Sequence, residues 1–383
     1  MASKLNIKQR IADFKAMDKA DKRRWWSEFF IENALYIIIV LAIIGIYIYN
    51  NNFLSIASIV NIITLSAANL PIALGIAGAI ILTGTDLSAG RVVGLTACIA
   101  ASLLQAADYS SKMFAGIGTL PIPVVILLVI AVGAIIGAVN GFCVAKFDLH
   151  PFIVTLATQL IVYGMLLMYL TLGSNNGQSI SGLSDSYKNF ITGSILQVGP
   201  KNTPIPNFVW YVVALTVVMW FVWNKTTFGK NMFAVGSNPE AANVSGVNVL
   251  RTIILVFTLA GAMYGITGFI EGARIGSNSA LTGQNYELDA IAACVIGGVS
   301  FVGGIGKISG VITGVFLLRI IFVGLTMLSV SSDWQYIIKG LIILVACAID
   351  MRKYRARKYP GFPILRFQRR PLVFPWRAAH FAL

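Results

Sequence analysis

Long apolar runs, separated by short polar stretches, cover most of the chain between residues 33 and 350. A helix needs about 20 apolar residues to cross a bilayer, and lipid offers no partners for free backbone groups. The runs are therefore predicted to be transmembrane helices of an all-α integral membrane protein. The pattern indicates ten spans: 33–49, 53–83, 88–106, 122–145, 151–172, 208–224, 252–272, 289–304, 308–329 and 334–350.

Two of these runs leave their structure open. The run 53–83 is too long for one straight crossing, and it contains Pro71, which removes a backbone donor and bends a helix. It is either one kinked span or a span followed by a re-entrant half-helix. The run 289–304 is short and rich in glycine, so the pattern does not define its ends.

Composition and charge support a membrane protein and orient it. The chain is 57% hydrophobic and only 11% charged, against about 25% charged residues in a soluble domain. Eight of its 29 lysines and arginines precede Trp25, and nine follow Asp350. Basic tails remain on the cytosolic side, so both termini are predicted there, which requires an even number of spans. The net charge of +14 has no nucleic-acid-binding motif beside it, so nucleic acid is not an expected partner.

Both tails are predicted as separate regions around a permease domain at 33–350. In the tail 1–32, Ile7, Ile11 and Phe14 follow helical spacing between basic residues, which indicates an amphipathic helix. That helix either lies on membrane lipid or belongs to a solvated tail with a docking stripe. The tail 351–383 is basic and contains proline, and we expect it to be a disordered cytosolic extension.

Charged residues are sparse within the spans. An ionisable side chain deep in a bilayer costs at least about 2.5–3.5 kcal/mol, so ion-coupled transporters accept such residues mainly where ions bind. The charges in or beside the spans lie near span ends, which favours helix-end roles and makes ion coupling less expected. These residues are Asp86, Arg91, Glu271, Arg274, Glu287, Asp289, Arg319 and Lys339.

Two glycine-rich stretches place an aspartate beside small residues. They are TGTDLSAG at 83–90 and ELDAIAACVIGGVSFVGGIG at 287–306. Small residues allow tight helix crossings and hinges, and an aspartate is able to cap a half-helix. One interpretation is close packing alone. The other is a translocation path or hinge formed by Asp86, Ser88, Gly90, Asp289, Gly297, Gly298, Gly303 and Gly304.

An internal echo suggests two related halves. Gly133 and Gly137 in one span have the same spacing as Gly310 and Gly314 in a later one, and each pair allows a close helix crossing. A polar turn and a further span follow each pair. Two-half repeats are common in transporters, although such glycine pairs also occur widely in other membrane helices.

The polar stretch GSNPEAANVSG, at 236–246, predicts a short helix within the loop 225–251. Ser237 or Asn238 is suited to cap it, Pro239 to its first turn, Glu240 to a capping box and Gly246 to a left-handed stop. Isolated helices shorter than about 12–15 residues are marginal in water, so this helix must pack on something. Ten spans place it in the cytosol, where it either docks on a partner or packs on its own protein.

The sequence contains no recognisable catalytic or nucleotide-binding motif. The chain lacks a Gly-x-x-x-x-Gly-Lys-Ser/Thr phosphate loop, and its only histidines are His150 and His380. Four cysteines, at 98, 143, 294 and 347, lie in apolar runs and are expected to pack as small hydrophobic residues. The chain is therefore not expected to be an enzyme by itself or to bind a metal.

Several stretches resemble one family. EAANVSG fits the pattern Glu-Ala-Ala-x-x-x-Gly and resembles the cytoplasmic motif of permease subunits of ATP-binding-cassette importers. The longer motif continues to Ile-x-Leu-Pro, whereas this chain has Val256, Thr258 and Leu259. TGTDLSAG, TTFGKNMFAVGSNPEAANVSGVNV and GGVSFVGGIG resemble segments of the ribose and galactose group. With ELDAIAAC and DWQYIIKG, the pattern over residues 30–355 is most similar to galactose/methyl-galactoside permeases.

The resemblance implies a multi-pass protein of the bacterial inner membrane that forms a homodimer. Its partners would be an ATP-binding-cassette ATPase subunit, which binds ATP and Mg, and a periplasmic sugar-binding protein; this chain would bind no cofactor. The coupling helix would include Ser237, Asn238, Pro239, Glu240, Ala241, Ala242 and Gly246. Two alternatives are a stand-alone secondary sugar transporter or facilitator, which the internal echo favours, and a membrane scaffold without transport.

Overall fold

The computed structural model describes residues 18, 22, 40, 43–199 and 202–358, with side chains up to residue 348. The predicted tail helix at Ile7–Phe14, most of the span 33–49 and the end of the basic tail lie outside these residues. Residues 43–49 are helical.

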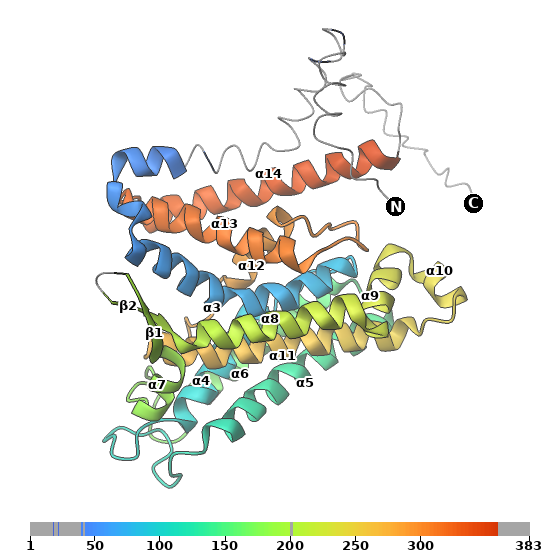
Figure 1. Cartoon of the computed structure of the whole chain (residues 1–383). Coiled ribbons are helices and arrows are strands. Elements are labelled where there is room, and N and C mark those ends of the chain that lie inside the picture. The colour runs from blue at the N-terminus through green and yellow to red at the C-terminus, as the bar shows by residue number, and fades with distance from the viewer. Residues whose placement is uncertain (1–17, 19–21, 23–39, 41–42, 200–201, 359–383) are drawn as a thin grey trace, which may run out of the picture.

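The described chain is a bundle of helices whose long members lie side by side (Figure 1). After a short 3₁₀ turn η1 (Asn51–Leu54), the elements are α3 (Ile56–Ile81), α4 (Ala89–Leu103), α5 (Ile122–Phe147), α6 (Pro151–Leu170), α7 (Asp185–Thr192), β1 (Ser194–Val198), β2 (Thr203–Pro206), α8 (Asn207–Lys225), α9 (Thr227–Ser237), α10 (Pro239–Val244), α11 (Val249–Ile275), α12 (Tyr286–Ile296), α13 (Ile308–Met327) and α14 (Ser332–Lys358). We call the end with α7, β1 and β2 the hairpin end, and the opposite end the α10 end.

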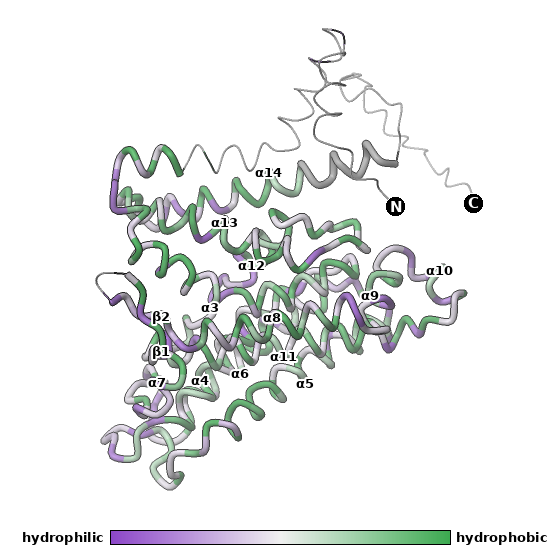
Figure 2. The backbone as a smooth tube through the Cα atoms, in the orientation of Figure 1, coloured by the Kyte–Doolittle hydropathy of each residue, from purple (hydrophilic) through white to green (hydrophobic). Residues whose placement is uncertain are grey.

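Helices α3 and α11 form the centre of the bundle. In their most apolar windows 72% and 61% of the residues are buried, against 22–28% in α5, α6 and α8. Helix α11 packs on α3, α4 and α5, whereas α3 also packs on α8, α12 and α13. Figure 2 shows apolar colour along the long helices and polar segments near α7 and around α9 and α10. Helices that are apolar all round and exposed on their outer faces are suited to lipid.

Six described helices are long and apolar enough to cross a membrane: α3, α5, α6, α8, α11 and α13. Helix α3 is continuous through Pro71, so the alternative of a re-entrant half-helix within 53–83 is wrong. Helix α14 continues to Lys358, beyond the predicted span end at residue 350. The predicted total of ten spans stays a prediction.

Two predicted spans are shorter helices. Helix α4 has 15 residues, about 22 Å at 1.5 Å per residue, against about 30 Å of hydrocarbon. Helix α12 has 11 residues, about 16 Å, and the chain leaves helical structure after Ile296. The prediction of one continuous span over 289–304 is therefore wrong. Gly298, two residues after Ile296, has φ +83°, a left-handed conformation that a helix does not continue through, and Gly303 and Gly304 in the following loop have φ of +90° and +65°.

The loop between α6 and α8 contains structure that hydropathy did not predict. Helix α7 begins at a Ser184 cap, and β1 and β2 pair antiparallel with Val198 opposite Thr203. This hairpin corrects the all-α prediction in a small way. In a polar loop, the backbone N–H and C=O groups are able to form hydrogen bonds with each other in a short helix or hairpin. A hydropathy profile does not detect such local structure.

Candidate functional site

Helix α10 is the short helix predicted from GSNPEAANVSG. Oδ1 of Asn238 accepts a hydrogen bond from the backbone N–H of Ala241 at 2.9 Å, which satisfies one of the free donors at the helix start. Gly246 has φ +86°, the left-handed conformation that stops the helix. Ala242 is buried, whereas Glu240 and Ala241 are exposed.

The predicted capping box does not form as the sequence suggested. Ser237 belongs to α9, and its hydroxyl donates to the carbonyl of Phe233 at 2.8 Å. Because Asn238 is the cap, Glu240 occupies the second helical position, one residue before the position that closes a capping box. Glu240 is thus a solvent-exposed carboxylate in the first turn of α10, where the helix dipole favours negative charge.

The surface around α10 is hollowed. A hollow of about 600 Å³ lies between α10 and the start of α11, and Glu240, Asn243 and Asn248 are among the residues that line it. Val244, the last residue of α10, is 90% exposed. Sequence reasoning missed Val244 because an isolated apolar residue in a polar loop carries no signal.

Helices α4 and α12 begin inside the bundle, and their starts are in contact. A β-carbon on Gly90 would lie 2.0 Å from Oε2 of Glu287 and 2.4 Å from the carbonyl oxygen of Gly283. Glu287 lies in the first turn of α12 and is only 4% exposed. The N-terminal ends of two half-helices therefore face one buried carboxylate, and helix dipoles favour negative charge at that position.

Asp86, in the loop before α4, anchors a buried polar chain. Its Oδ1 accepts hydrogen bonds from the N–H and hydroxyl of Ser88 at 3.0 and 2.6 Å, and its Oδ2 accepts one from the Tyr264 hydroxyl at 3.1 Å. The Asn140 amide donates to Ser88 Oγ at 3.1 Å, and Thr158 donates to Asn140 Oδ1 at 2.6 Å. This chain joins the loop to α5, α6 and α11, and Asp86 is fully buried.

We expect Asp86→Ala to destabilise the protein far more than Asp86→Asn. Alanine leaves the Ser88 N–H and the Tyr264 hydroxyl without their acceptor, at about 1–3 kcal/mol for each buried orphaned group. Asparagine retains one acceptor oxygen, and its amide is able to donate to the Tyr264 oxygen. Thermal unfolding of the purified protein in detergent checks this, with exposed Asp185→Ala on α7 as the control. Equal unfolding temperatures for both Asp86 variants would contradict it.

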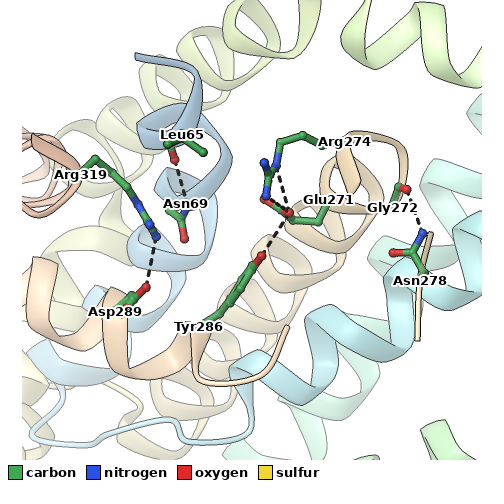
Figure 3. Close-up of polar contacts among 9 residues, drawn as sticks. All are labelled: Leu65, Asn69, Glu271, Gly272, Arg274, Asn278, Tyr286, Asp289 and Arg319. Carbon is green, nitrogen blue, oxygen red and sulfur yellow. Dashed lines mark hydrogen bonds and ion pairs between the residues drawn. The ribbon is translucent and has the colours of Figure 1, made fainter. Parts of the chain in front are cut away.

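Asp289 joins three helices through two cations. Its Oδ2 lies 3.3 Å from Nη2 of Arg319 on α13, and its Oδ1 lies 2.5 Å from Nζ of Lys339 on α14. The side chains are 13%, 17% and 15% exposed, respectively. Figure 3 shows Asp289 and Arg319 reaching toward each other from neighbouring helices. This cluster therefore has one more positive charge than negative charge.

Asn69 of α3 lies beside this cluster (Figure 3). Its amide donates to the carbonyl of Leu65 at 2.9 Å, whereas its Oδ1 has no hydrogen-bond partner among the described residues. A cavity of about 10 Å³, lined by Asn69, Asp289 and Arg319 among others, has room for about one water molecule.

A second buried ion pair holds the start of α12 against α11. Glu271, which is fully buried, accepts hydrogen bonds from Nε and Nη2 of Arg274 at 3.0 and 2.7 Å. The hydroxyl of Tyr286, the first residue of α12, donates to Glu271 Oε2 at 3.3 Å (Figure 3). The first turn of α12 thus contacts charged side chains on two sides.

The prediction that the charged residues lie near span ends is wrong for Arg319, whereas Asp289 does lie in the first turn of α12. Arg319 lies within α13, and Asp289 projects toward it from a helix that begins inside the bundle. Hydropathy placed Asp289 at the edge of an apolar run. It does not reveal that the helix formed by this run begins among the other helices, rather than at an end of the bundle. The sequence did contain one signal: Arg319 and Lys339 lie within the predicted spans 308–329 and 334–350, where each needs an acidic partner such as Asp289.

The eight candidate path or hinge residues fall into three places, so they do not line one cavity. Asp86, Ser88 and Gly90 surround the start of α4, and Asp289 faces α13 and α14. The loop after α12 contains the other four: Gly297, Gly298, Gly303 and Gly304. A role in translocation stays a prediction for all eight. Partners that the sequence reasoning missed are Asn140, Thr158, Tyr264 and Tyr286.

Comparison with known proteins agrees with a transport protein built around this bundle. Residues 58–347 match the family described as branched-chain amino acid transport system / permease component. The galactose/methyl galactoside import permease protein MglC of Haemophilus influenzae is 46% identical over 85% of this chain and 96% of its own length. That of Escherichia coli is 45% identical over the same shares, and the ribose import permease protein RbsC of Escherichia coli is 34% identical over 86% and 97%. No solved structure matches. The chain therefore belongs to the family of transport-system permease components that includes the galactose/methyl galactoside and ribose import permeases.

Proposed function

We propose that this chain is the membrane-spanning subunit of an ATP-driven importer of galactose or methyl galactoside in a bacterial inner membrane. The names of its relatives support the substrate class. In this proposal a periplasmic sugar-binding protein delivers the sugar, two copies of the chain form the pore, and both termini lie in the cytosol. ATP and Mg are bound by a separate ATPase subunit, and this chain binds no cofactor.

Helix α10 is the proposed docking element for that ATPase, and its geometry is the observation that carries the proposal. It is capped and short, and it presents Glu240, Ala241 and Val244 to solvent beside the hollow lined by Asn243. A helix of six residues is not stable alone, so its regular structure depends on the fold behind it. An exposed apolar tip beside a hollow is a surface that a partner protein is able to cover.

Transport assays with purified components test the function. The chain is reconstituted in vesicles with its ATPase subunit and the sugar-binding protein, and uptake of labelled galactose is followed with and without ATP. We expect uptake only when ATP, the ATPase and the binding protein are all present. Uptake by the chain alone, driven by a sugar or ion gradient, would instead support the stand-alone transporter.

We expect α10 variants to separate ATPase binding from folding. Val244→Asp places a charge where the partner is proposed to bury an apolar group, and Gly246→Val forces a branched side chain into φ +86°. Both should lower co-purification of the ATPase at least ten-fold and abolish uptake. Glu240→Gln should reduce uptake less, because it retains the helix and removes only a charge. Val198→Asp in the hairpin is the control, and normal ATPase binding by Val244→Asp would contradict α10 docking.

A further inference from the structure

The end of α9, immediately before α10, makes direct backbone contact with two other segments. The carbonyl oxygen of Ile81, the last residue of α3, accepts a hydrogen bond from the N–H of Gly304 at 2.9 Å. A β-carbon on Gly236 would lie 1.9 Å from that same oxygen and 2.9 Å from the Gly304 nitrogen. We call this meeting point of α3, α9 and the loop after α12 the glycine junction.

The other residues of the glycine junction are packed as closely. A β-carbon on Gly303 would lie 2.3 Å from the carbonyl oxygen of Gly236 and 2.4 Å from Cγ2 of Thr83. One on Gly304 would lie 2.0 Å from Oγ of Ser237. Backbone therefore meets backbone between Gly236 and both Ile81 and Gly303, and the side-chain atoms nearest these glycines belong to the short residues Thr83 and Ser237. No long, flexible side chain is among these contacts to absorb a displacement. Tightly packed contacts of this kind transmit strain.

Two of the three segments at the glycine junction connect to the half-helices α4 and α12. Beyond Ile81 the chain enters the loop that contains the buried Asp86 and then begins α4. The loop with Gly303 and Gly304 continues directly from α12, which contains Glu287 and Asp289. The segment that presents α10 thus contacts the end of α3, from which a short loop leads to α4, and the loop that follows directly from α12.

We propose that the glycine junction transmits movement of α10 to the half-helices α4 and α12. This inference rests on the proposed function, in which the ATPase binds α10. Gly236, Gly303 and Gly304 are positioning residues: they contact neither nucleotide nor sugar, and they determine whether ATP hydrolysis moves the interior helices. Helix α11, which follows α10 along the chain, is then not the only route for that movement.

Two substitutions at the glycine junction test the inference, one by adding atoms to the contact and the other by removing them. Gly236→Ala inserts a methyl group against the Ile81 carbonyl, and Ser237→Gly removes the atoms on which Gly304 rests without adding any clash. Gly306→Ala is the matched control, because in the same loop its β-carbon would first meet Cδ1 of Ile81, at 2.9 Å. That atom is the movable tip of a side chain, so the loop is expected to accept the methyl group.

The measurement is the number of ATP molecules hydrolysed per galactose imported, in vesicles with the ATPase and the sugar-binding protein. We expect Gly236→Ala to raise this ratio at least ten-fold and Ser237→Gly several-fold, with normal co-purification of the ATPase. Gly306→Ala should match the wild type. If Gly236→Ala does not fold, as judged by size-exclusion chromatography, Ser237→Gly decides the question.

The two proposals fail in different ways. A wild-type protein that imports galactose without ATPase would overturn the proposed function. A wild-type protein that needs ATP, together with an unchanged ratio in Ser237→Gly and in any folded Gly236→Ala, would overturn only the glycine junction. Loss of ATPase binding in these variants, in parallel with loss of uptake, would also overturn it, because the junction would then merely hold α10 in place.

Discussion

Asp289→Ala is expected to prevent accumulation of the folded protein. The substitution leaves Arg319 and Lys339, which are 17% and 15% exposed, without the carboxylate between them. Removing one partner of a buried ion pair costs about 3–5 kcal/mol, because an uncompensated charge remains inside. At about 1.4 kcal/mol per factor of ten, that lowers the ratio of folded to unfolded protein by about two to four powers of ten.

A second substitution distinguishes charge from packing. In Asp289→Ala with Arg319→Met, one uncompensated cation remains, Lys339, instead of two. The double variant should therefore regain part of the lost stability, measured as the unfolding temperature in detergent. Lys188→Ala, which removes an exposed pair on α7, should change the unfolding temperature little, because water and salt screen such a pair. A single Asp289 variant as stable as the wild type would show that the cluster does not hold the three helices.

The sequence predicted the long helices well because a membrane helix must be apolar along its whole length. The runs behind α5, α6, α8 and α11 agree with the structure to within a few residues. The cap and stop of α10 were also readable, because Asn238 and Gly246 act through local backbone geometry. Features determined by neighbouring residues in the sequence are the ones that pattern reasoning recovers.

The broken helices were not predictable, because their partners come from elsewhere in the chain. The apolar run 289–304 looks continuous, but the chain leaves helical structure after Ile296, and the N–H of Gly304 in the following loop bonds to the carbonyl of Ile81 at the end of α3. In the same way Asp86 is tolerated because Ser88 and Tyr264 donate to it. A hydropathy scale measures the free energy of transferring a residue from water into lipid. These residues are instead surrounded by protein groups that form hydrogen bonds with them, so the scale does not describe their environment.

The glycine pairs that formed the internal echo both lie at close helix contacts. On α5, β-carbons at Gly133 and Gly137 would each lie 2.1 Å from a carbonyl oxygen of α11. On α13, one at Gly314 would lie 1.9 Å from the carbonyl oxygen of Ala293 on α12, and one at Gly310 would lie 2.1 Å from that of Gly297. The two pairs thus have the same local role in packing, whether or not the halves share an origin.

Gly133→Leu is expected to abolish the packing of α5 on α11 and with it the folded bundle. Overpacking a core with flexible neighbours costs about 1–3 kcal/mol, but here the neighbour is the backbone of Gly261, which is unable to change rotamer. Gly133→Ala should give an intermediate loss. Gly164→Leu on α6 is the matched control, because a β-carbon there meets nothing within 4 Å. Expression, monodispersity and unfolding temperature in detergent measure the series. A Gly133→Leu protein as stable as Gly164→Leu would mean that α5 and α11 are free to separate, and the close crossing at the centre of this bundle would not be needed for its fold.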